Sequence, residues 1–251
     1  MSQPQLIAHR GYSKHYPENT LPGIIAALDA GASMIEVDIQ FTADGIPVLF
    51  HDATLVRTTG APGRIMDHTL EQLQPIHANE TTRLGTRFSG TTIPTLASLV
   101  KLLLSRPGVT AFIELKEESL HHFGTRQLVS TTLGQLAPIL PQCVLISYDH
   151  FSLQEARRLG ANSIGWVLRH YDETARQLAH RLSPDYLICN HNKLPIAGIA
   201  LWSGNWRWAS YEVTSLNQAL ALYQRGIHLF ETMSVGELLD ELEQFSDDGS
   251  Y

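Results

Sequence analysis

Cysteine is scarce in this chain of 251 residues, which contains only Cys143 and Cys189, each inside an apolar run. Disulfide-stabilised folds need a far higher cysteine content, so we expect two packed thiols and a reducing compartment. Long hydrophobic runs are missing as well, because no stretch of about 18 apolar residues occurs. The first residues, MSQPQLIAH, lack the basic and apolar regions of a signal peptide. The sequence therefore predicts no membrane span and a cytoplasmic location.

Positive charge is limited too, since 18 Lys and Arg residues stand against 25 Asp and Glu residues, a formal net charge of −7. The cations are scattered singly or in pairs, so no nucleic-acid partner is expected, although a small anion can still bind locally. Apolar residues make up 43% of the chain and charged residues 17%. This balance excludes a disordered or collagen-like chain and is typical of a globular protein.

Short apolar segments alternate with longer amphipathic ones, which predicts parallel strands joined by helical crossovers. The predicted strands are residues 5–9, 34–40, 110–115, 143–147, 163–168, 185–189, 207–213 and 228–232. The predicted helices are residues 19–30, 96–104, 120–136, 153–159, 173–182, 216–224 and 235–245.

Residues 46–50 form an additional predicted strand that breaks this alternation. The Asp44-Gly45 pair before it is a hairpin signal, and the connection is too short for a parallel crossover, so this strand is expected to run antiparallel to its predecessor. Without it, eight strand–helix units remain, the number that closes an α/β TIM (β/α)8 barrel. We expect a single barrel domain over residues 1–251, with residues 52–95 inserted as a small subdomain after the second strand.

Three acidic residues are expected to converge at the mouth of this barrel. Glu36 and Asp38 alternate with apolar residues in one strand, and Glu114 repeats the pattern in the next. The apolar neighbours of a barrel strand face the helices, so the carboxylates point inward at the carboxyl end, where TIM barrels keep their active sites. An E-x-D pair alone is most often part of a half-exposed strand. Three converging carboxylates, however, need a cation or a proton, and a divalent ion with oxygen ligands fits them.

Two histidines and two cations lie at the same strand ends. His9 ends the first strand and His51 the antiparallel one, and imidazoles can take and give protons near neutral pH. The chain has 12 histidines, so a surface or packing role is the alternative for each. Arg10 and Lys116 suit a phosphate, although ion pairs with the nearby carboxylates would explain them equally well. Together these residues predict metal-assisted cleavage of a phosphoester, whereas an amidohydrolase would carry H-x-H where this chain reads His9-Arg10-Gly11.

The motifs and their order resemble those of the glycerophosphodiester phosphodiesterase family, in particular its short cytosolic bacterial members. The similar stretches are HRGYSKHYPENTLPGIIAALDAGASMIEVDIQFTADGIPVLFHDATLVRTTGAPGRI, IPTLASLV, FIELK, ISYD and CNHNKL, which cover nearly the whole chain in order. The resemblance implies a TIM barrel with one bound divalent cation, Mg²⁺ or Ca²⁺. It also implies hydrolysis of glycerophosphodiesters, such as glycerophosphocholine or glycerophosphoethanolamine, to glycerol 3-phosphate and an alcohol.

The same resemblance implies a role for each site residue. The acid–base pair would be His9 and His51, the phosphate would be bound by Arg10 and Lys116, and the metal would be held by Glu36, Asp38 and Glu114. The sequence does not reveal which histidine is the acid. Either water or a neighbouring glycerol hydroxyl can be the nucleophile. Two alternatives stay open: a lysophospholipase D-type hydrolase, and a barrel that binds glycerophosphodiesters without cleaving them.

The chain departs from the family near its end, where W-T-V-N is replaced by Y-E-V-T at residues 211–214. Tyr211 can still supply an aromatic wall to the substrate pocket. Glu212 alternates with it and is expected to face outward. The usual T-D-x-P is likewise replaced by T-M-S-V at residues 232–235.

The P-E-N-T segment is expected to begin a helix. Asn19 or Thr20 is the capping candidate, and a structural role is favoured for Asn19. Glu18 could reach the site from behind, and Asp52 could orient the adjacent His51.

Overall fold

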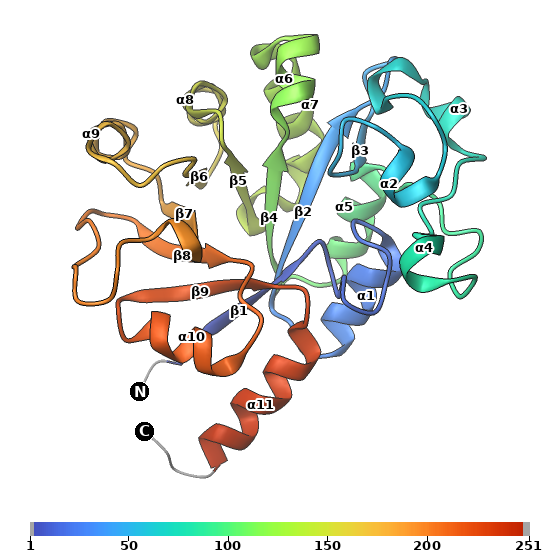
Figure 1. Ribbon diagram of the computed structural model, residues 1–251. Helices are drawn as coiled ribbons and strands as arrows, with labels where there is room; N and C mark the ends of the chain where they lie inside the picture. Colours follow the sequence, from blue (N-terminus) through green and yellow to red (C-terminus); the bar gives the residue numbers. More distant parts are fainter. Residues whose placement is uncertain (1–2, 248–251) are drawn as a thin grey trace.

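The computed structural model describes residues 3–247 and forms a closed barrel (Figure 1). One sheet of 9 strands has the order β1-β9-β8-β7-β6-β5-β4-β2-β3, and an additional β1–β2 pairing closes it. All pairs are parallel except β2–β3, which is antiparallel. Eight parallel strands with helices between them confirm the predicted TIM barrel, and the antiparallel strand is also as predicted.

Each strand lies within two residues of its predicted bounds. The strands are β1 (Gln5–His9), β2 (Met34–Phe41), β3 (Pro47–Leu49), β4 (Thr110–Leu115), β5 (Cys143–Ser147), β6 (Ile164–Val167), β7 (Tyr186–Asn190), β8 (Arg207–Tyr211) and β9 (Ile227–Thr232). The longer helices are α1 (Leu21–Asp29), α5 (Leu96–Leu104), α6 (Glu117–Phe123), α7 (Thr125–Leu136), α8 (His150–Arg158), α9 (Glu173–Leu182), α10 (Leu216–Tyr223) and α11 (Val235–Asp247).

The prediction of one helix over residues 120–136 is wrong. Gly124, with a left-handed φ of 88°, ends α6, and α7 starts at the next residue. Glycine adopts this conformation without the steric cost that a side chain would bring. A hydrophobic period continues across such a break, so periodicity alone did not reveal it.

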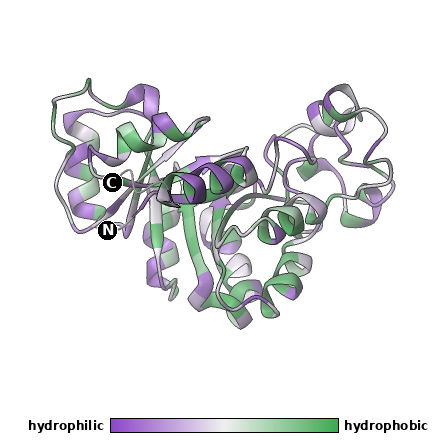
Figure 2. Cartoon of the chain, turned by 90° about the horizontal axis from the view of Figure 1, so that it is seen from below, coloured by the Kyte–Doolittle hydropathy of each residue, from purple (hydrophilic) through white to green (hydrophobic). Residues whose placement is uncertain are grey.

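Strand side chains alternate between two cores. Val37 and Ile113 belong to a large outer core between the strands and the helices. Ile7, Met34 and Phe112 belong to a smaller core inside the barrel. Figure 2 shows the result, with hydrophobic strands in the centre and helices of mixed hydropathy around them. This alternation leaves the inward positions at the carboxyl ends of the strands for polar side chains.

The antiparallel strand β3 uses an edge that β1 leaves open. Residue pairing between β1 and β2 ends with His9 opposite Glu36. Further along β2, Ile39 pairs with Leu49 of β3 instead. The chain therefore returns toward the barrel mouth, and this return brings His51 back to the end of β2.

Residues 52–95 leave the barrel beside β3 and fold around a small apolar cluster of their own (Figure 1, upper right). The segment contains α2 (Val56–Thr59), η1 (Ile65–Asp67), α3 (Leu70–Leu73) and α4 (Thr81–Leu84). Its cluster includes Leu55, Ile65 and Leu73, together with Val48 of β3. Because Val48 belongs both to β3 and to this cluster, it connects the cluster to the sheet.

Both thiols are free and buried, which confirms the expected packing of Cys143 and Cys189. Among residues 3–247, no helix combines the length and the hydrophobicity that crossing a bilayer requires.

Helix α11 is tied to the loop after β1 through the carboxylate of Glu237. The Tyr12 hydroxyl donates to it at 2.6 Å, Lys14 Nζ lies 2.9 Å away and His15 Nε2 2.7 Å away. Partial burial alone would raise the pKa of Glu237, but these three partners lower it to about 2. The network connects the last helix of the barrel to its first strand.

Replacing Glu237 with Gln is expected to lower Tm by about 1–4 °C at pH 7, measured by calorimetry. A carboxyl whose pKa is depressed in the folded state contributes stability above its unfolded pKa of 4.5, and this contribution is lost as the pH falls toward 2. The Tm difference between wild type and variant should therefore shrink below pH 4.5. Glu241→Gln, on an exposed part of the same helix, is the control. A difference that stays constant down to pH 2.5 would contradict the assignment.

Candidate active site

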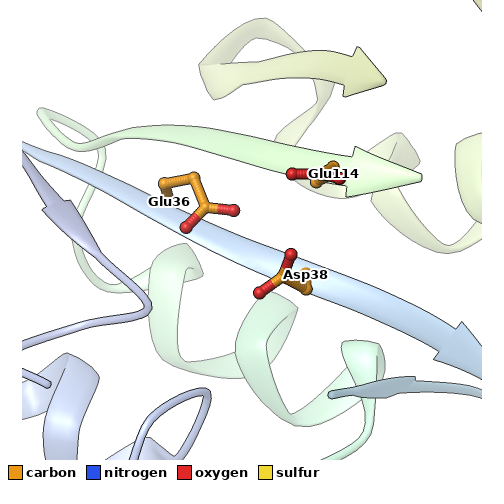
Figure 3. A group of neighbouring side chains, drawn as sticks. All are labelled: Glu36, Asp38 and Glu114. Carbon is orange, nitrogen blue, oxygen red and sulfur yellow. The ribbon is translucent and has the colours of Figure 1, made fainter. Parts of the chain in front are cut away.

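The strand register brings the three predicted metal ligands together. Asp38 of β2 pairs directly with Glu114 of β4, and Glu36 lies two residues earlier on the same face of β2. One oxygen of each carboxylate lies within 4.8 Å of the others. Figure 3 shows the three side chains gathered on one side of the two neighbouring strands.

Two cations lie against these carboxylates. Arg10 Nε is 3.1 Å from Asp38 Oδ2, while Lys116 Nζ is 3.3 Å from Asp38 Oδ1 and 2.9 Å from Glu114 Oε1. Burial alone would raise the pKa of Asp38, but the two cations lower it below its usual range. Burial raises the pKa of Glu114, although Lys116 opposes this shift. The ion pairs that formed the alternative explanation for Arg10 and Lys116 are thus present.

The donor set fits a hard divalent cation. Glu36 is only 1% exposed, and its Oε1 has no hydrogen-bond partner among residues 3–247. Burial and the nearby Asp38 raise the pKa of Glu36 well above its usual value. A buried carboxylate of this kind is stable only with a proton or a further positive charge. Carboxylate oxygens are the ligands that Mg²⁺ and Ca²⁺ prefer.

The two predicted catalytic histidines lie at the same mouth. His9 Nε2 is 3.8 Å from Glu36 Oε2, and burial together with the Arg10 charge lowers the pKa of His9 to about 3. His51 Nδ1 lies 2.6 Å from Asp52 Oδ1. This contact occupies one nitrogen of the His51 ring and leaves Nε2 for another partner. Asp52 thus makes the orienting contact that the sequence suggested.

In the P-E-N-T segment, Thr20 caps a helix and Asn19 contacts the site. Thr20 is the N-cap of α1, and its hydroxyl accepts a hydrogen bond from the Gly23 amide. Asn19 does not cap the helix. Its Nδ2 donates to Asp38 Oδ2 at 2.9 Å, and its Oδ1 accepts from the Asp38 amide at 3.0 Å. The capping candidacy of Asn19 is therefore wrong, and its structural role is to hold Asp38.

Arg57, which the sequence analysis did not single out, connects residues 52–95 to the barrel mouth. It lies on α2 and donates to both carboxylate oxygens of Glu18, at 2.8 and 2.6 Å. Its Nε also donates to Asp52 Oδ2 at 2.7 Å. Glu18 in turn accepts a hydrogen bond from Arg10 Nη1 at 3.1 Å. The Arg57 guanidinium thus holds Glu18, which contacts the predicted phosphate ligand Arg10. It also holds Asp52, which contacts the predicted catalytic residue His51.

A cavity of about 380 Å³ opens between these groups. Six of the predicted site residues line it, namely His9, Arg10, His51, Glu114, Lys116 and Tyr211. The other two, Glu36 and Asp38, are buried beside it. A larger open hollow of about 1280 Å³ lies at the amino ends of the strands, beside α11. The predicted chemistry lies entirely at the opposite mouth.

Sequence reasoning missed several residues of this cavity, among them Tyr148, Asn190, Lys193 and Glu231. The Tyr148 and Tyr211 hydroxyls are 2.9 Å apart. The signal for Glu231 was present, because it follows the apolar residues Leu229 and Phe230 near the end of its strand, as Glu114 follows Phe112 and Ile113 in β4. Burial, followed by the charges of other carboxylates, raises the pKa of Glu231 to about 8.

The expectation that Glu212 faces outward is wrong, because it lies on the cavity rim beside Tyr211. Alternation applies only while the chain stays extended, and Glu212 leaves the strand with a φ of 62°. Asn190 Nδ2 donates to Glu212 Oε2 at 2.7 Å and holds the side chain at the rim.

Gly11 lets the chain turn immediately after Arg10, the predicted phosphate ligand. Its φ is 80°, and a Cβ there would lie 2.7 Å from the backbone carbon of Gly23. Gly45, in the β2–β3 turn, has a similar φ of 75° but no atom within 4 Å of such a Cβ. A substitution at Gly45 therefore costs only the energy of placing a side chain at a left-handed φ. A substitution at Gly11 adds the energy of the close approach to Gly23.

Comparison with known proteins gives one consistent family. The model of the glycerophosphoryl diester phosphodiesterase family matches residues 9–185. The chain is 46% identical over 110 residues to glycerophosphodiester phosphodiesterase 1 of Bos taurus, covering 44% of this chain and 33% of that protein. It is 32% identical over 154 residues to the glycerophosphodiester phosphodiesterase of Caldanaerobacter subterraneus subsp. tengcongensis, covering 61% and 62%. These matches thus span a third to three fifths of the curated relatives' lengths.

Among solved structures, a phosphodiesterase of Oleispira antarctica in complex with its product sn-glycerol-3-phosphate superposes with a TM-score of 0.84. The match covers 96% of this chain and 97% of that one at 24% sequence identity. This likeness supports the barrel fold over nearly the whole chain.

Alanine at Gly45 is expected to cost about 1–2 kcal/mol, because only the left-handed conformation opposes it. Alanine at Gly11 should cost about 3 kcal/mol or more, because backbone must move as well. Urea unfolding of the two variants measures both values. Equal losses of stability would contradict the close approach of Gly11 and Gly23.

Proposed function

The chain belongs to the glycerophosphoryl diester phosphodiesterase family, and on this premise we propose that it hydrolyses glycerophosphodiesters to glycerol 3-phosphate and an alcohol. The observation that carries the proposal is the convergence of two histidines, two cations and three carboxylates on one cavity. Glycerophosphocholine and glycerophosphoethanolamine are the proposed substrates. The proposal extends to a single barrel domain over residues 1–251, with residues 52–95 as an inserted subdomain, and to a cytoplasmic location.

Glu36, Asp38 and Glu114 would hold one divalent cation, Mg²⁺ or Ca²⁺, which when bound supplies positive charge to a phosphate oxygen. Arg10 and Lys116 lie over these ligands on the cavity side, and we propose that they bind non-bridging phosphate oxygens. Their positive charge favours the negative charge that develops as the phosphoester bond breaks.

His9 and His51 are the proposed acid–base pair. One imidazole takes the proton of the nucleophile as its oxygen bonds to phosphorus, and the other gives a proton to the departing alkoxide as its bond to phosphorus breaks. The nucleophile is water or the neighbouring hydroxyl of the glycerol moiety. A cyclic phosphate product would identify the second. Asp52 keeps the ring of His51 in one orientation throughout.

Alanine at His9 or His51 is expected to lower kcat about 10²- to 10⁴-fold while Tm changes little, since each side chain acts on the reacting atoms. A coupled assay for glycerol 3-phosphate release measures the effect. His121→Ala, on the exposed surface of α6, is the matched control. Turnover within a factor of three of wild type in either cavity variant would rule out that histidine.

Treatment with EDTA should abolish release of glycerol 3-phosphate from glycerophosphocholine, and added Mg²⁺ or Ca²⁺ should restore it. Calorimetric titration of the metal-free protein gives a second readout, in which Glu36→Gln weakens cation binding at least about 10-fold. Glu118→Gln, exposed on α6, is the control.

Parallel incubation with lysophosphatidylcholine separates the proposal from its alternatives. Faster cleavage of that lipid would favour a lysophospholipase D-type activity. Binding of glycerophosphocholine without turnover would indicate a non-catalytic barrel. Full activity in EDTA would contradict the proposed metal dependence.

A further inference from the structure

Glu231 contributes a carboxyl to the cavity that the proposed reaction does not use. It lies near the end of β9, is 5% exposed and lines the cavity wall. Its Oε1 is fully buried and has no hydrogen-bond partner among residues 3–247. Leaving a buried polar atom without a partner destabilises a fold, so this oxygen is available for a group that enters the cavity.

The other two carboxyls that line the cavity already have partners. Lys116 Nζ donates to Glu114 Oε1 at 2.9 Å. Asn190 Nδ2 donates to Glu212 Oε2 at 2.7 Å. Glu231 is therefore the cavity carboxyl, in the described part of the chain, whose side chain makes no hydrogen bond or ion pair.

Strand register places Glu231 on the inner side of the predicted reaction centre. It pairs with Ile7 of β1, two residues before His9. The cavity wall around this level also includes the apolar side chains of Ile146, Val167 and Ile188. A ligand group that reaches Glu231 thus lies deeper than His9, near these apolar side chains and near the carboxylates of Glu114 and Asp38, whose charges act on Glu231.

The chemistry of such a group is that of a neutral hydroxyl. A glycerol moiety loses water from its hydroxyls on entering the cavity, and each then needs an acceptor. A carboxyl oxygen accepts from a hydroxyl in either protonation state. With the proposed divalent cation held by the three carboxylates, the positive charges of that ion and of the cavity residues Arg10, Lys116 and Lys193 would oppose the burial of an ammonium group there.

We propose that Glu231 accepts a hydrogen bond from a hydroxyl of the glycerol moiety and so makes the cavity selective for the glycerol end of its substrate. This inference rests on the proposed function for the identity of the ligand. Glu231 is then a specificity residue rather than a part of the proton-transfer pair.

Two substitutions separate this role from a structural one. Glu231→Met keeps an unbranched side chain of similar length but removes the acceptor, whereas Glu231→Gln keeps an acceptor. Because the carboxyl has no partner in the protein, the Met variant should have a Tm equal to or above that of wild type. A Tm that falls in the Met variant would overturn the inference in favour of a structural role.

Calorimetric binding of sn-glycerol 3-phosphate and its two deoxy analogues, 1,2-propanediol 1-phosphate and 1,3-propanediol phosphate, tests the contact directly. With Mg²⁺ or Ca²⁺ present, wild type and Glu231→Gln should bind the parent about 10- to 100-fold more tightly than at least one analogue. In Glu231→Met this preference should fall to within about threefold, through weaker binding of the parent alone. Glu243→Gln, exposed on α11, is the control and should match wild type.

Several outcomes would overturn the inference. They are an undiminished preference in Glu231→Met, equal weakening of parent and analogues, and no measurable binding of the parent to wild type. A loss of turnover in Glu231→Met on glycerophosphocholine but not on glycerophosphoglycerol would overturn it too, because it would indicate contact with the ammonium group. The expected binding pattern without turnover by wild type would support the inference while defeating the proposed hydrolysis.

Discussion

The barrel mouth depends on one electrostatic constraint, the burial of the carboxylates of Glu36, Asp38 and Glu114 within a few ångströms of one another. Their mutual repulsion and their desolvation both oppose the ionised state. Arg10 and Lys116 offset part of this cost by lying directly against two of the three. Neither cation offsets the cost at Glu36, whose Oε1 has no hydrogen-bond partner in the described chain. The arrangement is therefore suited to a cation, which would stabilise it when bound.

Much of the surrounding structure serves to hold these charges in place. Arg10 takes a left-handed φ of 58°, Asn19 one of 55° and Glu212 one of 62°. Each such conformation costs a non-glycine residue about 1 kcal/mol or more, so it persists only where the surroundings impose it. All three residues make polar contacts at the mouth. Three of the five non-glycine residues with a left-handed φ in the described chain thus lie at the mouth, while Glu80 and Ser183 lie elsewhere. Such an enrichment of strain is typical of a site shaped for binding rather than for stability.

The fold was predictable because its determinants are local. Alternation along each strand, a short Asp-Gly turn and helical spacing between strands were enough to give the barrel and the antiparallel strand. The break between α6 and α7 at Gly124 was not predicted, because the spacing of apolar residues is the same with or without a single left-handed residue. The inward direction of Glu36, Asp38 and Glu114 followed from the same alternation, and the structure places them as predicted.

The supporting residues were harder to predict because their partners are distant in sequence. Asn19 looks like a cap in its local context, and only the tertiary structure brings it to Asp38. Arg57 looks like one more scattered cation until residues 52–95 fold back on the mouth. Pairwise contacts across 19 or 39 residues leave no periodic signal in a single sequence.

Glu231 differs from these because its own strand contained the signal. An acidic residue on the inner face of a barrel strand has few ways to be stabilised. Glu36 and Glu114 also lie on inner faces, and each has at least one polar partner in the protein. Glu231 is buried without such a partner, so the stability of the fold does not explain why a carboxyl stands at this position. A ligand hydroxyl bound to Glu231 would supply the missing hydrogen-bond partner. The carboxyl oxygen that destabilises the protein without a ligand would then stabilise the complex.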